Sequence, residues 1–298
     1  MSYDLHFYRK KDNTLTYSEI KSEIKKLVPQ NTSEIDTQIN YENERTGVYF
    51  LIDFNEPNTE KEDIEIFDSF DDFENLNIST SINFFRPDFF GKEIFPIITY
   101  FSEKLDLYML NLQEFDESRH KPLKWTEKEL IEHWTEHNSI VSKKHGQEHE
   151  LKFMDKEKSD YFWSYTSQID KLENEIKDDI YIPNPFVLQN KESKELFTAI
   201  AWTQSIPLIL PQVDFVIILK KYKKLFKNVE EIGMVKYQDI LEKFASEFEV
   251  YDSDNKLLIL RQSNADKIKK DFNAFPIWKS HKDFGPQVGF DGFVNHKQ

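Results

Sequence analysis

The chain has 298 residues, 39% of them hydrophobic, and its 26 Phe and 13 Tyr residues can offset the entropy cost of folding, which excludes a disordered protein. Because it contains no cysteine, disulfides, thiolate metal ligands and a cysteine nucleophile are excluded, and we expect a protein of the reducing cytoplasm. The net charge of −15 repels nucleic acid and anionic membranes and favours a basic protein as partner.

The length favours two domains, and residues 1–120 predict the first of them, an N-terminal α+β module. Residues 3–8 alternate as a strand does, and they lack the apolar run of a secretory signal. A capping box at Thr16–Glu19 begins a helix that Pro29 ends. Further strands are expected over residues 34–41, 48–54, 76–85 and 107–112, and a helix over 91–105 despite Pro96. Together they predict a mixed sheet covered by helices.

Residues 121–178 lack strand signals and predict a helical connector between two modules. A second capping box, at Thr126–Glu129, begins a helix that runs to about Lys144, where Gly146 follows to stop it. A second helix is expected over residues 156–177. The same two helices could equally form a layer of the module that follows.

Residues 179–298 predict a C-terminal α+β module with an irregular tail, so the fold class is α+β with two mixed-sheet modules. Residues 197–219 approach the length of a membrane span, but Asp214 and two prolines interrupt them. We therefore expect three short buried strands, over 197–203, 206–210 and 213–219. A helix over 237–248, a strand over 256–260 and a helix over 265–272 follow, and the glycine-containing tail after Pro276 is expected to lie irregularly on a surface.

The string His133-Trp134-Thr135-Glu136-His137 has the H-x-x-E-H spacing of inverted zinc peptidases. Positions i and i+4 put both imidazoles on one helical face, and Glu136 would be the general base. The same face carries Leu130 and Trp134, and no convincing downstream carboxylate ligand follows. We therefore predict histidines hydrogen-bonded at the edge of the core, without metal, cofactor or catalytic residues. A zinc-dependent hydrolase using His133, Glu136 and His137 is the alternative.

The segment from Asp53 to Glu74 contains ten carboxylates and one lysine, interleaved with isoleucines and phenylalanines. Carboxylates attract a basic surface, and buried aromatic anchors contribute most of the binding energy at interfaces. The residues predicted to contact a partner are Asp63, Glu65, Asp68, Phe70, Asp71, Asp72 and Glu74. The alternative is a solvated amphipathic element whose aromatic side chains point inward.

Three further segments carry a resemblance: the opening Met1-Ser2-Tyr3-Asp4-Leu5-His6-Phe7-Tyr8, Thr46-Gly47-Val48-Tyr49-Phe50, and Phe84-Phe85-Arg86-Pro87-Asp88-Phe89-Phe90-Gly91. They resemble an uncharacterised bacterial family similar to the immunity proteins of contact-delivered polymorphic toxin systems. The resemblance covers mainly the first 140 residues, and no catalytic residue can be carried over from it. It implies a cytoplasmic, non-enzymatic protein that binds a cognate protein toxin and occludes its active site. A structural or adaptor protein unrelated to toxins is a further alternative.

Overall fold

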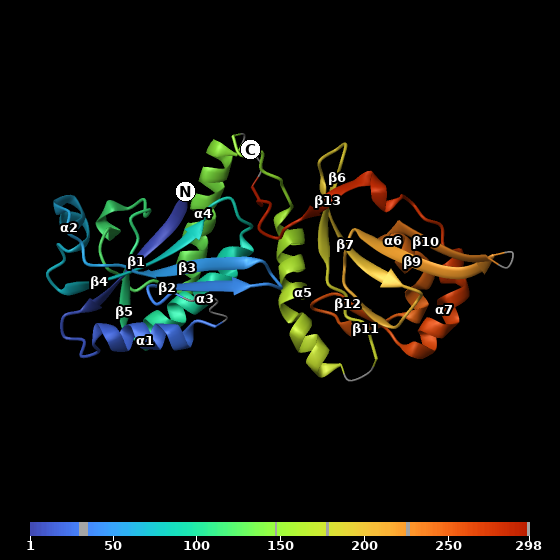
Figure 1. The fold of residues 1–298 in the computed structure, drawn as a ribbon, viewed down its shortest axis with the longest axis horizontal. Coiled ribbons are helices and arrows are strands. Elements are labelled where there is room, and N and C mark those ends of the chain that lie inside the picture. The colour runs from blue at the N-terminus through green and yellow to red at the C-terminus, as the bar shows by residue number, and fades with distance from the viewer. Residues whose placement is uncertain (30–34, 147, 177–178, 225–226, 297–298) are drawn as a thin grey trace. The chain divides into compact units, whose positions relative to one another are not determined.

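The computed structural model describes residues 1–29, 35–146, 148–176, 179–224, 227–296 of the chain. They form two compact units (Figure 1). The first unit comprises Met1–Leu151 together with Phe293–Gln298, and the second comprises Lys152–Gly292. The α+β class predicted from the sequence is confirmed, with several sheets and covering helices.

The first unit contains a sheet with the strand order β2-β3-β4-β1-β5, in which neighbouring strands are antiparallel. Its strands are β1 (Ser2–Lys10), β2 (Gln38–Asn43), β3 (Val48–Phe54), β4 (Phe73–Asn83) and β5 (Leu107–Leu110). The central strand β1 alternates because Tyr3, Leu5 and Phe7 are buried in the core. The strand expected over residues 34–41 begins at Gln38, and Glu34 lies outside the described residues.

One face of this sheet is covered by helices, of which Figure 1 shows α1 and α3 beneath the strands. Helix α3 contacts β3 and β5, α1 and α4 contact α3, and the phenylalanines of α3 fill the core. The helices of the unit are α1 (Tyr17–Leu27), α2 (Lys61–Phe67), α3 (Phe89–Lys104) and α4 (Glu127–His145), with a 3-10 turn at Glu117–Arg119. Both predicted capping boxes, at Thr16 and Thr126, are present, and Pro96 lies inside α3.

The opposite face of the sheet is polar and half-buried. Ser81 donates a hydrogen bond to Asp4 at 2.6 Å, and Gln38 donates one to Asp53 at 2.7 Å, each pair joining neighbouring strands. Such pairing satisfies polar groups on an antiparallel sheet that is packed on one side only. The chain leaves the covered core after β3, forms α2 and then enters β4, so the acidic segment belongs to this first unit.

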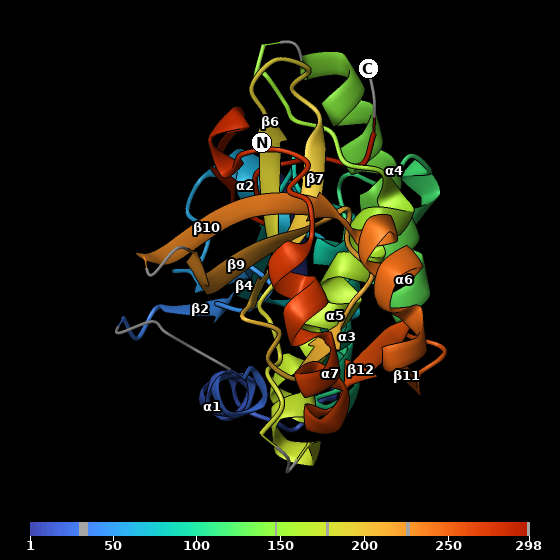
Figure 2. The same ribbon diagram turned by 90° about the vertical axis from the view of Figure 1, so that its right-hand side faces the viewer.

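The second unit contains two sheets, with the strand orders β10-β9-β7-β6-β13 and β11-β12-β8 among the described residues. Strands β7 and β9 are parallel, and helices α6 and α7 contact β10 and β9 respectively (Figure 2). The strands are β6 (Phe186–Asn190), β7 (Leu196–Thr203), β8 (Leu208–Leu210), β9 (Phe215–Lys224), β10 (Lys227–Lys236), β11 (Glu249–Asp252), β12 (Leu257–Leu260) and β13 (Phe284–Val288). The helices are α5 (Lys156–Glu175), α6 (Tyr237–Phe244) and α7 (Gln262–Ala274), with 3-10 turns at Ala245–Glu247 and His281–Asp283.

The apolar stretch over residues 197–219 forms β7, β8 and β9, as the sequence predicted. Its one charged residue, Asp214, accepts two hydrogen bonds from Lys158 at 2.9 Å and one from the backbone of Thr198 at 2.8 Å. Among the described residues, no helix has the length and apolar character needed to cross a bilayer.

The expected helical connector, residues 121–178, is divided between the two units. Helix α4 packs on α3 of the first unit, whereas Ile169 of α5 lies in a buried cluster with Ile209 and Ile259 of the second. Each helix therefore buries its apolar stripe against a different core, and the two do not form a separate layer.

The tail after Pro276 differs from the irregular surface segment expected from the sequence. Strand β13 pairs with β6, and the last described residues return to the first unit, where Phe293 and Val294 are buried. There the backbone N–H of Asp88 donates to the side chain of Asn295 at 2.7 Å, and His296 pairs with the Asp88 carboxylate at 2.8 Å. The glycines of the tail give no periodic pattern from which this pairing could be predicted.

Candidate functional site

The acidic segment forms an exposed ridge made of α2 and the residues that lead into β4. We use the name acidic ridge for the residues that the sequence predicted as a partner contact. Six of them have exposed side chains and Phe70 is half-buried; the set is Asp63, Glu65, Asp68, Phe70, Asp71, Asp72 and Glu74. The structure therefore places these residues on one continuous stretch of the first unit's surface.

The apolar residues of the ridge divide into two groups. Phe67, Phe70 and Phe73 pack against the sheet, where they contact the rings of His6, Tyr8 and Tyr108 at centroid distances of 4.5, 5.6 and 4.9 Å. Tyr8 also donates a hydrogen bond to the backbone carbonyl of Phe67 at 2.9 Å, and burial raises the pKa of this phenol. The phenylalanines thus point inward, as the alternative interpretation of the segment proposed.

Two isoleucines of the ridge behave differently. Helix α2 buries none of its residues, and Ile64 and Ile66 are 42% and 46% exposed. A seven-residue helix is marginal in water, and the half-buried Phe67 at its end provides its apolar contact with the sheet. Ile64 and Ile66 therefore form an apolar spot surrounded by carboxylates.

The carboxylates of the ridge are unequally engaged. Asp68 accepts hydrogen bonds from Asn75 at 2.8 Å and Asn58 at 3.3 Å, which tie α2 to β4. Glu74 forms a bidentate pair with Arg9, and Glu65 lies 3.5 Å from Lys61. No ion pair to the remaining three, Asp63, Asp71 and Asp72, occurs within the described part of the chain, so they are available to an outside cation.

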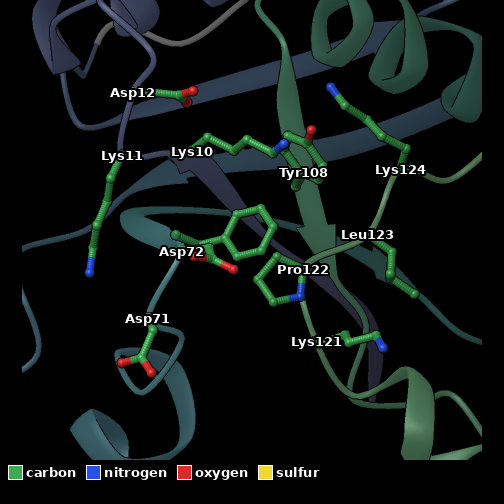
Figure 3. A pocket seen from close by; sticks show the side chains of 11 residues that line it. Lys10, Lys11, Asp12, Asp71, Asp72, Tyr108, Lys121, Pro122, Leu123 and Lys124 are labelled. Atoms are coloured by element: carbon green, nitrogen blue, oxygen red, sulfur yellow. The ribbon is translucent and has the colours of Figure 1, made fainter.

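Beside the ridge lies a cavity of about 740 Å³, which sequence reasoning missed. We call it the lysine cavity because Lys10, Lys11, Lys121 and Lys124 line it, together with Tyr108 and the ridge residues Asp71 and Asp72 (Figure 3). Its lysines come from the end of β1 and from a segment more than 100 residues later. Neither segment carries a motif, so no local pattern could have indicated that they share one cavity.

The predicted pair His133 and His137 lies on α4 with the two rings stacked at a centroid distance of 4.2 Å and an angle of 28°. Phe115 also stacks on His137, at a centroid distance of 4.2 Å. His137 Nδ1 donates to the backbone carbonyl of His133 at 3.0 Å. The i, i+4 spacing therefore brings the two imidazoles together as the sequence predicted.

His133 belongs to a buried polar network with Tyr3 and Asn111. The Tyr3 hydroxyl lies 2.9 Å from His133 Nδ1 and accepts a hydrogen bond from Asn111 at 2.8 Å, so its own proton points to the imidazole. This arrangement assigns the ring proton to Nε2, which faces Glu114 Oε1 at 3.6 Å. Burial, followed by the neighbouring His137, lowers the pKa of His133 to about 4, although the Glu114 carboxylate opposes that shift. His133 is thus a neutral structural hydrogen-bond acceptor at neutral pH.

The arrangement offers little to a zinc ion. Imidazole lone pairs lie in the ring planes, so two nearly parallel rings direct them side by side and not towards one point. Glu136 is exposed, whereas its neighbour His137 is buried. Among the residues that the structure describes, no group of three His, Asp or Glu side chains is placed to hold a metal ion.

Two charged segments of the second unit are held by local contacts. Asp252 begins the turn between β11 and β12 and accepts hydrogen bonds from the backbone of Asp254 and Asn255. The lysines after residue 219 belong to the β9–β10 pair, where Lys221 faces Glu230 at 2.8 Å. Comparison of the chain with known protein families, curated proteins and solved structures found no match. The features of the molecule that bear on function are therefore the acidic ridge, the lysine cavity and the histidine network.

Proposed function

We propose that this protein is a non-enzymatic binding protein that neutralises a cognate toxin by covering its active site with the acidic ridge. The observation that supports the proposal is helix α2, which buries none of its residues and exposes Ile64 and Ile66 between carboxylates. An apolar spot inside a charged rim is the arrangement found at protein interfaces.

The ridge supplies two separable contributions to such a complex. Unpaired carboxylates, among them Asp63, Asp71 and Asp72, steer a basic partner and raise the association rate. Ile64 and Ile66 would enter an apolar pocket of the partner and slow its release, because desolvated anchors at the centre of an interface determine dissociation. A toxin that cleaves a polyanionic substrate has a basic cleft, and an acidic ridge would fill it by charge complementarity.

The test uses the purified protein and the polypeptide encoded by the neighbouring gene, with association and dissociation rates measured by surface plasmon resonance. The variant Asp63→Lys/Asp71→Lys/Asp72→Lys should reduce the association rate at low salt by about tenfold or more. Asp68 is left intact because its hydrogen bonds to Asn58 and Asn75 hold α2 in place. The variant Ile64→Ala/Ile66→Ala should instead raise the dissociation rate by about tenfold or more.

A matched control reverses three exposed carboxylates of the second unit, in the variant Glu242→Lys/Asp254→Lys/Asp271→Lys. Each reversal adds two charges, so both triple variants carry a net charge of −9 in place of −15. The control should bind with nearly unchanged rates. Equal rates for the ridge variant and the control would rule out the ridge as the contact surface.

A further inference from the structure

The lysine cavity is held in shape by backbone pairing on both sides. Lys11 N–H donates to the carbonyl of Asp72 at 3.2 Å, which joins the end of β1 to the start of β4. On the other side, Leu123 exchanges two backbone hydrogen bonds with Met109 of β5, at 2.8 and 3.1 Å. The walls are therefore fixed before any ligand arrives, which lowers the entropy cost of binding.

Two ammonium groups approach one aromatic ring in this cavity. Lys124 Nζ lies 4.3 Å from the centroid of the Tyr108 ring and Lys10 Nζ lies 5.7 Å from it. Figure 3 shows the Lys10 side chain extended towards Tyr108, with Lys124 reaching the same ring from another segment. The two nitrogens are no more than about 10 Å apart, which is about one Debye length at 0.1 M salt, so the two charges repel each other at low ionic strength.

The cavity lining contains four lysines and three aspartates, and the aspartates are Asp12, Asp71 and Asp72. Lys124 pairs with Asp106 at 2.8 Å and donates to the carbonyl of Leu107. For Lys10, Lys11 and Lys121, no ion pair is present within the described ranges, although the chain has an excess of carboxylates. An anion placed between Lys10 and Lys124 would relieve their repulsion and gain charge-assisted hydrogen bonds from both.

We propose that the lysine cavity binds the phosphate group of a small molecule. Lysine is a compact point charge suited to phosphate, and the cavity volume lies in the range of small-molecule sites. Phe73 and Tyr108, whose rings are 4.9 Å apart, provide an apolar surface for the organic part of the ligand. Asp12, Asp71 and Asp72, which also line the cavity, repel a long polyanion, so the site selects a small ligand and not nucleic acid.

This site does not depend on toxin binding by the acidic ridge. The proposal concerns the ammonium groups of Lys10, Lys121 and Lys124, whereas toxin binding concerns the carboxylates and isoleucines of the ridge. Either can fail while the other holds.

Isothermal titration calorimetry of the full chain with inorganic phosphate in low-salt buffer tests the site. We expect saturable binding with a dissociation constant of about 1 mM. The variant Lys10→Gln/Lys124→Gln should weaken it by at least about tenfold. Lys124 also donates a hydrogen bond to the Leu107 carbonyl, so its replacement could disturb the structure. The variant Lys10→Gln/Lys121→Gln keeps this hydrogen bond and should also weaken phosphate binding.

The control variant Lys269→Gln/Lys270→Gln removes two exposed lysines of α7, and it should bind phosphate as the unmodified protein does. Succinate, a dicarboxylate that is fully ionised at neutral pH, is titrated in parallel at equal ionic strength and should bind more weakly although it carries at least as much negative charge. Absence of saturation by about 20 mM phosphate would overturn the proposal. Unchanged affinity in both cavity variants, or succinate binding as tight as that of phosphate, would do the same.

Discussion

At the scale of single residues, the histidines of α4 show how burial decides the role of an ionisable side chain. The spacing of His133 and His137 is compatible with a metal pair, but Tyr3 and Asn111 occupy one nitrogen of His133. Burial also raises the pKa of Tyr3, so its hydroxyl keeps the proton that it donates. The network is therefore matched to a neutral imidazole.

We predict that His133 makes the protein less stable as the pH falls from about 6.5 to about 4. In this window the imidazole binds a proton in the unfolded chain but stays neutral in the folded one. Each pH unit of acidification therefore lowers the free energy of unfolding by at most about 1.4 kcal/mol for one such group. The groups that face His133 are Tyr3, His137, Glu114 and Arg119, and the carboxylate of Glu114 reduces the effect. Urea unfolding from pH 4.5 to 7 measures it.

The variant His133→Gln should have a shallower dependence of stability on pH over the same range. His6 is a half-buried histidine whose pKa is also lowered by burial, against the opposing charge of Asp4, so some dependence should persist. The variant His6→Gln serves as the comparison and should retain the contribution of His133. An unchanged slope in His133→Gln would contradict the proposed neutral state.

At the scale of elements, several strands with regular alternation were predicted, whereas β10, which has a charged and glycine-containing sequence, was missed. Strand β10 contains Glu230, Glu231 and Gly233, yet it pairs with β9 along its whole length. Its glutamates Glu230 and Glu231 face Lys221 and Lys220 of β9. These cross-strand ion pairs favour the pairing of the two strands, although the sequence of β10 alone is polar. Such complementarity becomes visible only when the two strands are aligned.

Gly233 gives a direct test of packing on β10. A Cβ atom at this position would lie 2.3 Å from Cγ2 of Ile277, closer than van der Waals contact allows. We expect Gly233→Ala to lower the free energy of unfolding by about 1–3 kcal/mol, measured by urea denaturation. In the double variant Gly233→Ala/Ile277→Ala the smaller side chain at position 277 leaves room for the new methyl group. The double variant should therefore lose less stability than the sum of the losses in the two single variants. Strictly additive losses would mean that the two residues do not compete for space.

At the scale of the whole molecule, the first unit is built from two segments that are far apart in the sequence. The first unit is completed by the last described residues, and Phe293 is 1% exposed against Phe89 at a centroid distance of 6.4 Å. A chain that leaves one core, builds another and returns has contacts of very high sequence separation. The stability of the first unit should therefore depend on residues at the far end of the sequence.

We predict that Phe293→Ala lowers the stability of the first unit by about 3–5 kcal/mol, because a buried aromatic ring is removed from its core. Hydrogen exchange with mass spectrometry should show faster exchange in β1 and α3, with β7 and β9 little changed. The variant Phe275→Ala, which removes a buried ring from the core of the second unit, should give the reverse pattern. Loss of protection confined to the second unit in Phe293→Ala would contradict the assignment of the tail.

The sequence by itself determined the α+β class, the two capping boxes, the buried strands over residues 197–219 and the exposure of the ridge carboxylates. These features depend on periodicity and on neighbours within a few positions, and local physics decides them. The tertiary structure alone decided the division of the helical segment between two units, the return of the tail and the meeting of Lys10 with Lys124 at Tyr108. These features join residues far apart in the chain, and no local pattern encodes a contact whose free energy arises only when two distant surfaces are buried together.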